Sequence, residues 1–371
     1  MKKILFVANI PEHLFGFHYP YMKWFKEIGW KVHTASSKGM RLDYCDNQID
    51  ISVERTPFHF SNIKAYFQLK RIIESGKYDL IHCNTAVPSI LTILAARKSR
   101  KIYGTKVINT IHGFWFYKGA SIKNWLFYPI TKFCARYTDC LITINKEDYV
   151  FAQKKMNAKK IYNVSGVGFK DKFLNESTNP DFDKEIYRKK YGIVDNNTLM
   201  ILSVGEINKN KNHRLVIEAL SKLTDQKYVY FIAGEGASRE ELEKLTKEKN
   251  IDNKVIFLGF RDDVYELMHA ADIFVFPSRR EGLPVSLMEA MASSLPCIAS
   301  NIRGNNDLID ESGGILFENN NLEELITAFE ELINDKKKRK QMGEYNREKS
   351  KKFSLEAVLP AMKNIYQTII D

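Results

Sequence analysis

Short apolar runs alternate with longer amphipathic segments along most of the sequence, and this alternation constrains the fold more than any other feature. In the first half the runs are "KILFVANI", "KVHTAS", "DLIHCN", "KVINTIHG" and "CLITIN". In the second half they are "LMILSVG", "YVYFIAGEG", "KVIFLGF", "IFVFPS" and "PCIAS". Runs of this kind suit strands buried on both faces, and the helical stretches between them supply parallel crossovers. The sequence therefore predicts an α/β fold with two doubly wound parallel sheets.

The length of 371 residues exceeds what one hydrophobic core comfortably holds. The polar segment from Ser165 to Asp195 separates the two series of runs and is the best linker candidate. We expect an N-terminal Rossmann-like domain over residues 1–167 and a C-terminal domain over 168–345. Residues 346–371 are expected to form a C-terminal helical segment, and one possibility is that this segment packs back on the N-terminal domain.

The net positive charge of the protein comes from the first half of the chain alone. Residues 1–165 carry 26 Lys and Arg against 11 Asp and Glu, whereas residues 166–371 carry 30 against 34. This asymmetry suggests an anionic partner for the first half, either nucleic acid or an acidic membrane surface. Lysine-rich soluble proteins also carry such a charge without any specific partner.

Aromatic residues in the basic half favour the membrane. All four tryptophans lie there, and "FWFYKGASIKNWLFY", residues 114–128, mixes aromatic and basic side chains as the water–lipid interface favours. A partly buried aromatic helix explains the same stretch equally well. Because no RNA-recognition, helix-turn-helix or zinc-finger signature is present, a nucleic-acid partner is not expected.

The cysteines and the apolar runs indicate a cytoplasmic protein. The five cysteines are scattered without a C-x-x-C pair, which supports neither a disulfide framework nor a zinc site. No apolar run reaches the roughly 20 residues of a membrane span. The first run ends at Pro11 without a small-residue cleavage site and is interpreted as a strand rather than a signal peptide.

The stretch "SRREGLPVSLMEA", residues 278–290, follows a predicted strand and carries Glu281 and Glu289. Gly282 permits close backbone approach, and Pro284 favours the start of a helix whose unpaired N–H groups would suit a diphosphate. The two carboxylates would suit sugar hydroxyls of the same ligand. The alternative is a glutamate that stabilises the helix dipole and another on a solvated helix face. The apolar neighbours of Glu289 favour a partly buried carboxylate that needs partners.

These features together resemble the retaining glycosyltransferases of family 4, which have the GT-B fold. The resemblance rests on the stretch above and on "LSVGEINKNKN", "FIAGEG", "FLGFRDDVYELMHAADIF", "SNIRGNNDLI" and "HG" at residues 112–113. It is dense over about residues 200–317 and thinner in the first half. There, "HYPYMKWFKEIGWKVHTAS" resembles the exopolysaccharide and capsule-synthesis branch.

The resemblance implies three catalytic residues. Lys211 would bind the diphosphate and stabilise the charge that builds on it as the glycosidic bond breaks. Glu281 would bond the hydroxyls of the transferred sugar, and His112 would lie by the same sugar. Glu289 would hold the ribose, and Phe260 and Arg261 would bracket the base. The donor-binding residues implied in total are Gly16, Gly234, Glu235, Gly236, Phe260, Arg261, Gly282, Leu283, Pro284, Val285 and Glu289.

Three features depart from the family pattern. Glu206 stands where the family usually has Arg, and a carboxylate beside a diphosphate is costly unless it points away or pairs with Lys209 or Lys211. Of the paired glycines usual in the first loop, only Gly16 is present. His13 and His18 in that loop are candidates for acceptor contact, although a surface or helix-capping histidine is the commoner case.

No metal or cofactor is expected. The D-x-D at Asp181–Asp183 falls inside the linker, which gives poor support for a divalent metal on the diphosphate. Asp262 and Asp263 precede a predicted helix and are interpreted as its cap.

The resemblance implies a retaining, metal-independent hexosyltransferase that acts in cell-surface polysaccharide synthesis. The expected donor is a UDP-sugar, with an N-acetylhexosamine as the first expectation. The expected acceptor is a polyprenyl diphosphate-linked or other glycan, reached from the inner face of the cytoplasmic membrane. The alternatives are a transferase for a soluble small-molecule acceptor and a non-catalytic binder of nucleotide-sugars or nucleic acid.

Overall fold

The computed structural model describes residues 1–117, 119–175, 183–193, 195, 197–223 and 225–371. It divides into two compact units, Met1–Gly168 with Val358–Asp371, and Phe169–Ala357. We call them the N-terminal and the C-terminal unit. Residues 346–357 belong to the C-terminal unit, so the segment that returns to the N-terminal unit begins at Val358. Part of the expected linker, including residues 181 and 182 of the D-x-D, lies outside the described residues.

Among the described residues, seven parallel strands form the sheet of the N-terminal unit in the order β3-β2-β1-β4-β5-β6-β7. The strands are β1 Lys3–Val7, β2 Lys31–Ser36, β3 Asn47–Asp50, β4 Leu80–Asn84, β5 Lys106–Ile111, β6 Cys140–Thr143 and β7 Lys160–Asn163. The helices are α1 Pro11–Phe17, α2 Tyr19–Glu27, α3 Ser61–Gly76, α4 Ala86–Tyr103, α5 Ile122–Trp125, α6 Phe127–Ala135, α7 Lys146–Lys155 and α17 Leu355–Ile370. The strand order reverses between β1 and β4, which creates a topological switch point there.

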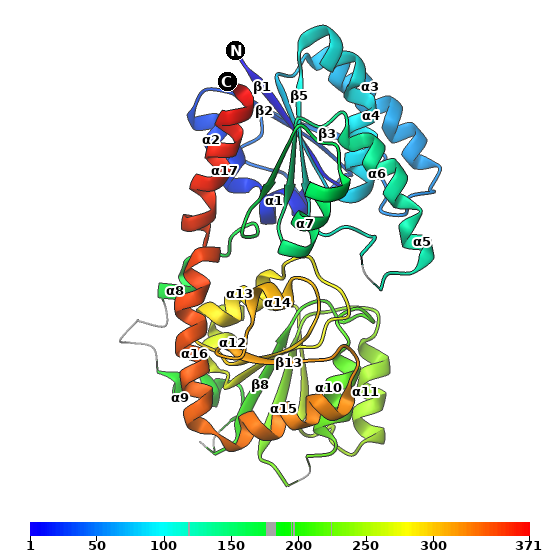
Figure 1. Cartoon of the computed structure of the whole chain (residues 1–371). Coiled ribbons are helices and arrows are strands. Elements are labelled where there is room, and N and C mark those ends of the chain that lie inside the picture. Colours follow the sequence, from blue (N-terminus) through cyan, green and yellow to red (C-terminus); the bar gives the residue numbers. More distant parts are fainter. Residues whose placement is uncertain (118, 176–182, 194, 196, 224) are drawn as a thin grey trace. The chain divides into compact units, whose positions relative to one another are not determined.

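Two apolar clusters cover opposite faces of this sheet. On one face α2 and α17 pack together, with the rings of Phe25 and Tyr366 4.9 Å apart between centroids. On the other face α3 and α4 contribute Leu69 and Ile93. Figure 1 shows α2 and α17 on one side of the strands and α3 and α4 on the other. The last helix of the chain is therefore part of the core of the N-terminal unit.

In the C-terminal unit the described residues form a six-stranded parallel sheet in the order β10-β9-β8-β11-β12-β13. The strands are β8 Leu199–Val204, β9 Tyr228–Ala233, β10 Val255–Gly259, β11 Ile273–Phe276, β12 Cys297–Ser300 and β13 Gly314–Phe317. The helices are α8 Lys172–Asn175, α9 Lys184–Lys190, α10 His213–Leu220, α11 Arg239–Glu248, α12 Val264–Ala270, α13 Val285–Ala292, α14 Asn305–Leu308, α15 Leu322–Asn334 and α16 Lys336–Ser350, with a 3₁₀ turn η2 at Lys351–Phe353. The order reverses between β8 and β11, so the loops after these two strands meet at the switch point of this sheet.

The predicted pair of doubly wound parallel sheets is confirmed, and each apolar run quoted above forms a strand. Three strands were not predicted, namely β3, β7 and β13. All three lie at the edge of a sheet. An edge strand is covered on fewer sides, and the sequences "NQID" and "KIYN" of β3 and β7 contain no residue that is fully buried. The signal of a continuous apolar run is therefore absent from them.

The tryptophan argument for a membrane partner is partly wrong. Trp24 and Trp30 lie in the core of the N-terminal unit, 8% and 7% exposed, and Trp24 stacks on Tyr366 of α17. Only Trp115 and Trp125 remain partly exposed. In the described part of the chain, no helix combines the length and apolar character needed to cross a membrane.

Candidate active site

Lys211 and Glu281 form an ion pair at the switch point of the C-terminal unit. Lys211 lies in the loop after β8 and Glu281 in the loop after β11, and their Nζ and Oε1 atoms are 2.8 Å apart. Both side chains are mostly buried, at 20% and 14% exposure. The ammonium group also lies 4.5 Å from the centroid of the Phe276 ring, a cation–π distance. Burial and two partners hold this cation at the carboxyl edge of the sheet.

Hydrogen bonds connect the loop after β8 with the loop after β11. The amide of Asn210 donates to the carbonyl of Arg280 at 3.0 Å, and the backbone N–H of Arg279 donates to the carbonyl of Asn210 at 2.8 Å. The guanidinium of Arg279 also donates to the side chain of Asn212. These bonds explain why the ion pair forms between residues 70 positions apart.

Glycines bring the loops after β8 and β9 into backbone contact. Gly234 and Gly236 have φ of 151° and 158°, which side-chain-bearing residues rarely adopt. A Cβ on Gly234 would lie 2.0 Å from the carbonyl oxygen of Gly205, and one on Gly236 would lie 2.3 Å from that of Ile207. The "GEG" turn is therefore required by packing within the unit, while the side chain of Glu235 is exposed.

Residues that follow β12, the strand next to β11, contact the loop before α13. The guanidinium of Arg303, after β12, donates to the carbonyl of Glu281 at 3.2 Å. A Cβ on Gly304 would lie 2.2 Å from the carbonyl oxygen of Gly282, so the two loops pack closely. The helix begins at Val285, and Pro284 is its N-cap with φ −76° and ψ 123° rather than its first residue. The N-cap side chain offers no hydrogen bond, so the first N–H groups of α13 are not satisfied by it.

Glu289 is a carboxyl group with an unusual proton affinity. It lies on α13 between the buried residues Met288 and Ala290. Burial raises its pKa to about 7, although Lys170 and Lys172 favour the charged form. No described residue donates a hydrogen bond to this carboxyl group, which fits the expectation of a half-buried acid that needs a partner.

Glu206 and Lys209 do not join this arrangement. Both side chains are exposed, and neither forms an ion pair with a described residue. Lys211 pairs with Glu281 and not with Glu206. The expected alternative in which Glu206 pairs with Lys209 or Lys211 is therefore not the one that the structure has.

The interpretation of Asp263 as a side-chain cap of α12 is wrong. Asp263 occupies the N-cap position, but its carboxylate makes no cap hydrogen bond. Instead Arg261 and the hydroxyl of Tyr191 both donate to it, and this pairing lowers its pKa to about 2. The charge of Arg261 is thus already compensated. Phe260, beside it, is 80% exposed.

In the N-terminal unit, three predicted histidines meet beyond the carboxyl edge of the sheet. His13 lies in α1, His18 follows that helix and His112 follows β5. One ring nitrogen from each lies within 4.8 Å of the others. Burial lowers the pKa of His112 to about 4 and those of His13 and His18 well below the ordinary value, so the rings are neutral at pH 7. Gly16, expected in a loop, is an exposed residue of helix α1, and a Cβ added to it would meet no atom within 4 Å.

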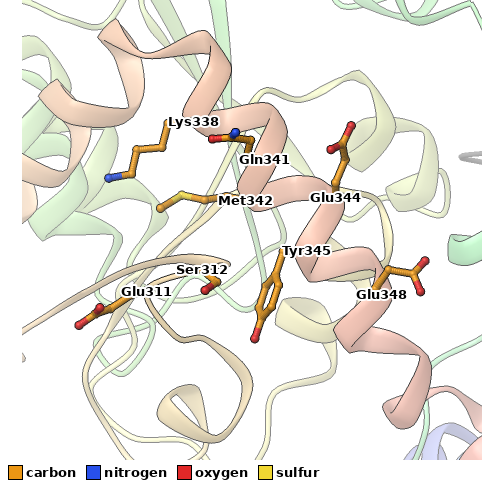
Figure 2. Close-up of a pocket in the computed structure, with 8 residues that line it drawn as sticks. All are labelled: Glu311, Ser312, Lys338, Gln341, Met342, Glu344, Tyr345 and Glu348. Carbon is orange, nitrogen blue, oxygen red and sulfur yellow. The ribbon is translucent and has the colours of Figure 1, made fainter.

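The cavity drawn in Figure 2 is unrelated to these residues. Its volume is about 620 Å³, and it lies between α16 and the loop before β13. In Figure 2, Met342 and Tyr345 point from α16 toward the loop that carries Glu311 and Ser312. None of the candidate donor residues lines it.

Sequence reasoning missed Phe276 and Asn208 as supports of Lys211. The Asn208 side chain accepts a hydrogen bond from the backbone N–H of Lys211 at 3.0 Å, and Phe276 provides the ring beneath the ammonium group. Phe276 ends a predicted strand directly before the loop of Glu281. The position of Phe276 at the end of β11 would indicate a contact with Lys211 only if β8 and β11 were known to be neighbours.

Family models and similar proteins of known sequence all indicate glycosyltransferases. Residues 183–349 match the family "Glycosyl transferases group 1", and residues 3–145 match "Glycosyl transferase 4-like". The putative glycosyltransferase EpsD of Bacillus subtilis is 36% identical over all of this chain and 97% of its own length. The UDP-Gal:alpha-D-GlcNAc-diphosphoundecaprenol alpha-1,3-galactosyltransferase of Escherichia coli is 30% identical over 81% of this chain and 79% of its own.

Solved structures give the same fold. The structure of Anabaena Alr3699/HepE in complex with UDP and glucose aligns with 99% of this chain and 100% of its own, with a TM-score of 0.79 at 18% identity. The GT-B fold expected from the sequence is thereby confirmed.

Proposed function

The chain belongs to the glycosyltransferases that carry a 4-like N-terminal and a group 1 C-terminal domain, and from this premise we propose that it transfers a sugar from a UDP-sugar to a lipid-linked glycan. The reaction retains the anomeric configuration and requires no metal on the donor diphosphate. The donor sugar is an N-acetylhexosamine, and the product is part of a cell-surface polysaccharide. The ion pair of Lys211 and Glu281 carries this proposal.

Lys211 acts on the leaving group. Its ammonium group has three donors, so it can bond a diphosphate oxygen while it keeps its contact with Glu281. As the bond between sugar and diphosphate breaks, negative charge grows on that oxygen, and a cation already held in place stabilises it without reorganisation. Its partly buried position strengthens this interaction relative to bulk water.

The two glutamates bind different hydroxyl groups of the donor. Glu281, 2.8 Å from Lys211, accepts hydrogen bonds from the transferred sugar next to the reacting carbon. Glu289, about one helix turn after the first residue of α13, binds the ribose. With a pKa of about 7 it is available both as an acceptor and, when protonated, as a donor. The exposed Phe260 and the backbone of Arg261 remain as the base contacts.

Two of the relatives support the choice of substrates. The Escherichia coli relative uses a UDP-sugar and a diphosphoundecaprenol-linked acceptor according to its name, and the Anabaena neighbour binds UDP and glucose. A polyprenyl diphosphate acceptor is anionic, which suits the positive charge of residues 1–165.

An aromatic surface on the N-terminal unit supports action at the inner face of the cytoplasmic membrane. Its apolar residues, with exposures between 59% and 86%, are Phe58, Phe60, Ile63, Phe67, Ile122 and Leu126. The ring of Phe58 lies 6.1 Å from that of Phe127 in α6, which joins the start of α3 to α5 and α6. Lys64 and Lys123 are exposed on the same helices. Apolar groups beside cations suit an anionic lipid surface.

A donor screen tests the central proposal. Nucleotide-sugars with different bases and sugars are added to the full-length protein, and the melting temperature is measured, because a ligand of the folded state raises it. We expect UDP-N-acetylhexosamines to give the largest shift and to transfer sugar to a polyprenyl diphosphate-linked acceptor in detergent. Equal shifts for all bases, or transfer only to soluble small molecules, would contradict the proposed substrates.

A further inference from the structure

The three histidines of the N-terminal unit surround a common point. His13 lies in α1, His18 lies between α1 and α2, and His112 directly follows β5. Their ring centroids are 4.7 Å apart for His13 and His112, 5.6 Å for His13 and His18, and 5.8 Å for His18 and His112. The rings are tilted or edge-on to one another, and one nitrogen of each ring lies within 4.8 Å of a nitrogen of each of the other two.

These rings lack hydrogen-bond partners where partners are expected. The Nε2 atoms of His13 and His112 and both ring nitrogens of His18 are buried without a hydrogen bond from any described residue. His82, a neighbour of His18, differs from them, because its Nδ1 contacts the hydroxyl of Tyr366 at 2.7 Å and its Nε2 that of Thr110 at 2.8 Å. A buried polar atom without a partner is unfavourable, and three such residues lie together here, so the group has unused capacity to bind a ligand.

The chemistry of the rings selects the ligand. Each of the three side chains presents one imidazole nitrogen to the group, and imidazole nitrogen is the commonest metal ligand in proteins. Imidazole nitrogen suits Zn²⁺ and similar transition metals, whereas Mg²⁺ and Ca²⁺ prefer oxygen. No carboxylate belongs to the group.

We propose that His13, His18 and His112 bind one transition-metal ion of the Zn²⁺ class. Zn–N bonds of about 2.0–2.1 Å in tetrahedral geometry place the nitrogens about 3.4 Å apart, so nitrogens now within 4.8 Å close by small side-chain rotations. Three protein ligands leave the fourth position for water or an anionic oxygen. An ion there engages His112 and removes that ring from other contacts. The site does not depend on the proposed sugar transfer.

Calorimetric titration of Zn²⁺ into the chelator-treated full-length protein tests this site. We expect one ion per chain, and we expect His13→Gln and His112→Gln each to weaken Zn²⁺ binding by at least about tenfold. The double variant should abolish stoichiometric binding. The glutamine side chains keep most of the volume, and thermal melts check that each variant folds. His18 is left unchanged because it is only 1% exposed.

A matched control and a spectroscopic probe complete the test. His59 is exposed in the same unit and bonds Ser61, so His59→Ala should bind Zn²⁺ as the wild type does. Co²⁺ added in place of Zn²⁺ should give the intense visible bands of a tetrahedral site, and both glutamine variants should lose them. Absence of stoichiometric binding, or equal affinity in the double variant and the wild type, would overturn the proposal.

Discussion

Lys211 has both a carboxylate and an aromatic ring as neighbours, and this environment makes its contribution testable at the scale of one residue. We predict that Lys211→Ala lowers the transfer rate at least about 100-fold, because a preorganised charge at the leaving group typically contributes that much. Initial rates at saturating donor measure the effect. Lys209→Ala is the matched control, since this exposed lysine of the same loop has no ion-pair partner among the described residues. A similar loss in both variants would show that general loop charge, and not Lys211, is responsible.

Glu289 gives a second prediction through its raised pKa. Its folded-state pKa is about 7 against a model value of 4.5, so the folded protein binds this proton more tightly than the unfolded chain. The contribution of Glu289 to stability is therefore full below about pH 4.5 and is lost as the pH rises through about 7. We expect the difference in the free energy of unfolding between wild type and Glu289→Gln to shift in favour of the variant from pH 5 to pH 8.

Denaturant melts at several pH values measure this difference. Glu206→Gln is the matched control, because it makes the same substitution at an exposed position of the same unit. A difference for Glu289→Gln that stays constant with pH would contradict the raised pKa.

At this scale the sequence predicted residue types and positions better than partners. The burial of Glu289 followed from its apolar neighbours on the helix, which are local. The pairing of Lys211 with Glu281 and the bonding of Asp263 to Arg261 and Tyr191 depend on loops and strands that are distant in the sequence. Pairing choices of this kind are fixed by the order of strands in the sheet, which the sequence pattern does not contain.

At the scale of elements, the aromatic stretch of residues 114–128 divides into two parts. Phe114 and Phe116 are buried and contact Phe151 of α7, whereas Ile122 and Leu126 are exposed. The buried part fits the alternative of a partly buried aromatic segment, whereas membrane contact by the exposed part stays a prediction. The sequence could not separate them, because the cover of the first part comes from a helix more than 30 residues away. Exposed apolar residues of α3 belong to the same surface as this exposed part, and the sequence pattern did not predict their exposure.

The aromatic surface predicts a defined membrane phenotype. We expect Phe60→Ser combined with Leu126→Ser to lower retention on anionic phospholipid vesicles at least about tenfold, since burial of a large apolar side chain contributes about 1.5–3 kcal/mol. Vesicle flotation at low salt measures retention, and thermal melts should be unchanged because both residues are exposed. Ile102→Ser is the control, since Ile102 is 56% exposed on α4 but lies outside the surface defined above. An equal loss in the control would point to nonspecific hydrophobicity.

At the scale of the whole molecule, the two sheets followed from the alternation of apolar runs. The switch point of the second sheet brings Lys211 and Glu281 together, and their role in the reaction stays a prediction. The sequence pattern does not indicate the histidine group as a metal site, because metal-binding motifs are recognised by ligands at short spacings and His112 is far from His13 and His18 in the sequence. His13 and His112 are 99 positions apart and meet only because the loops after β1 and β5 lie at one edge of the sheet.

The two proposals make opposite demands on metals, and their combination gives the last prediction. Sugar transfer driven by Lys211 needs no metal on the diphosphate, so excess EDTA should leave the transfer rate within about twofold of the untreated enzyme, as expected where a fixed cation stabilises the leaving group. Zn²⁺ bound to His112 should instead lower the rate, because a ring that ligates a metal is no longer available to the transferred sugar. Inhibition should follow the occupancy measured by calorimetry and be unchanged in His59→Ala. In His13→Gln it should require at least about tenfold more Zn²⁺, in proportion to the lost affinity. A strict requirement for Mg²⁺ would contradict the proposed transfer mechanism alone, whereas stoichiometric Zn²⁺ binding without inhibition would contradict only the role of His112 at the sugar.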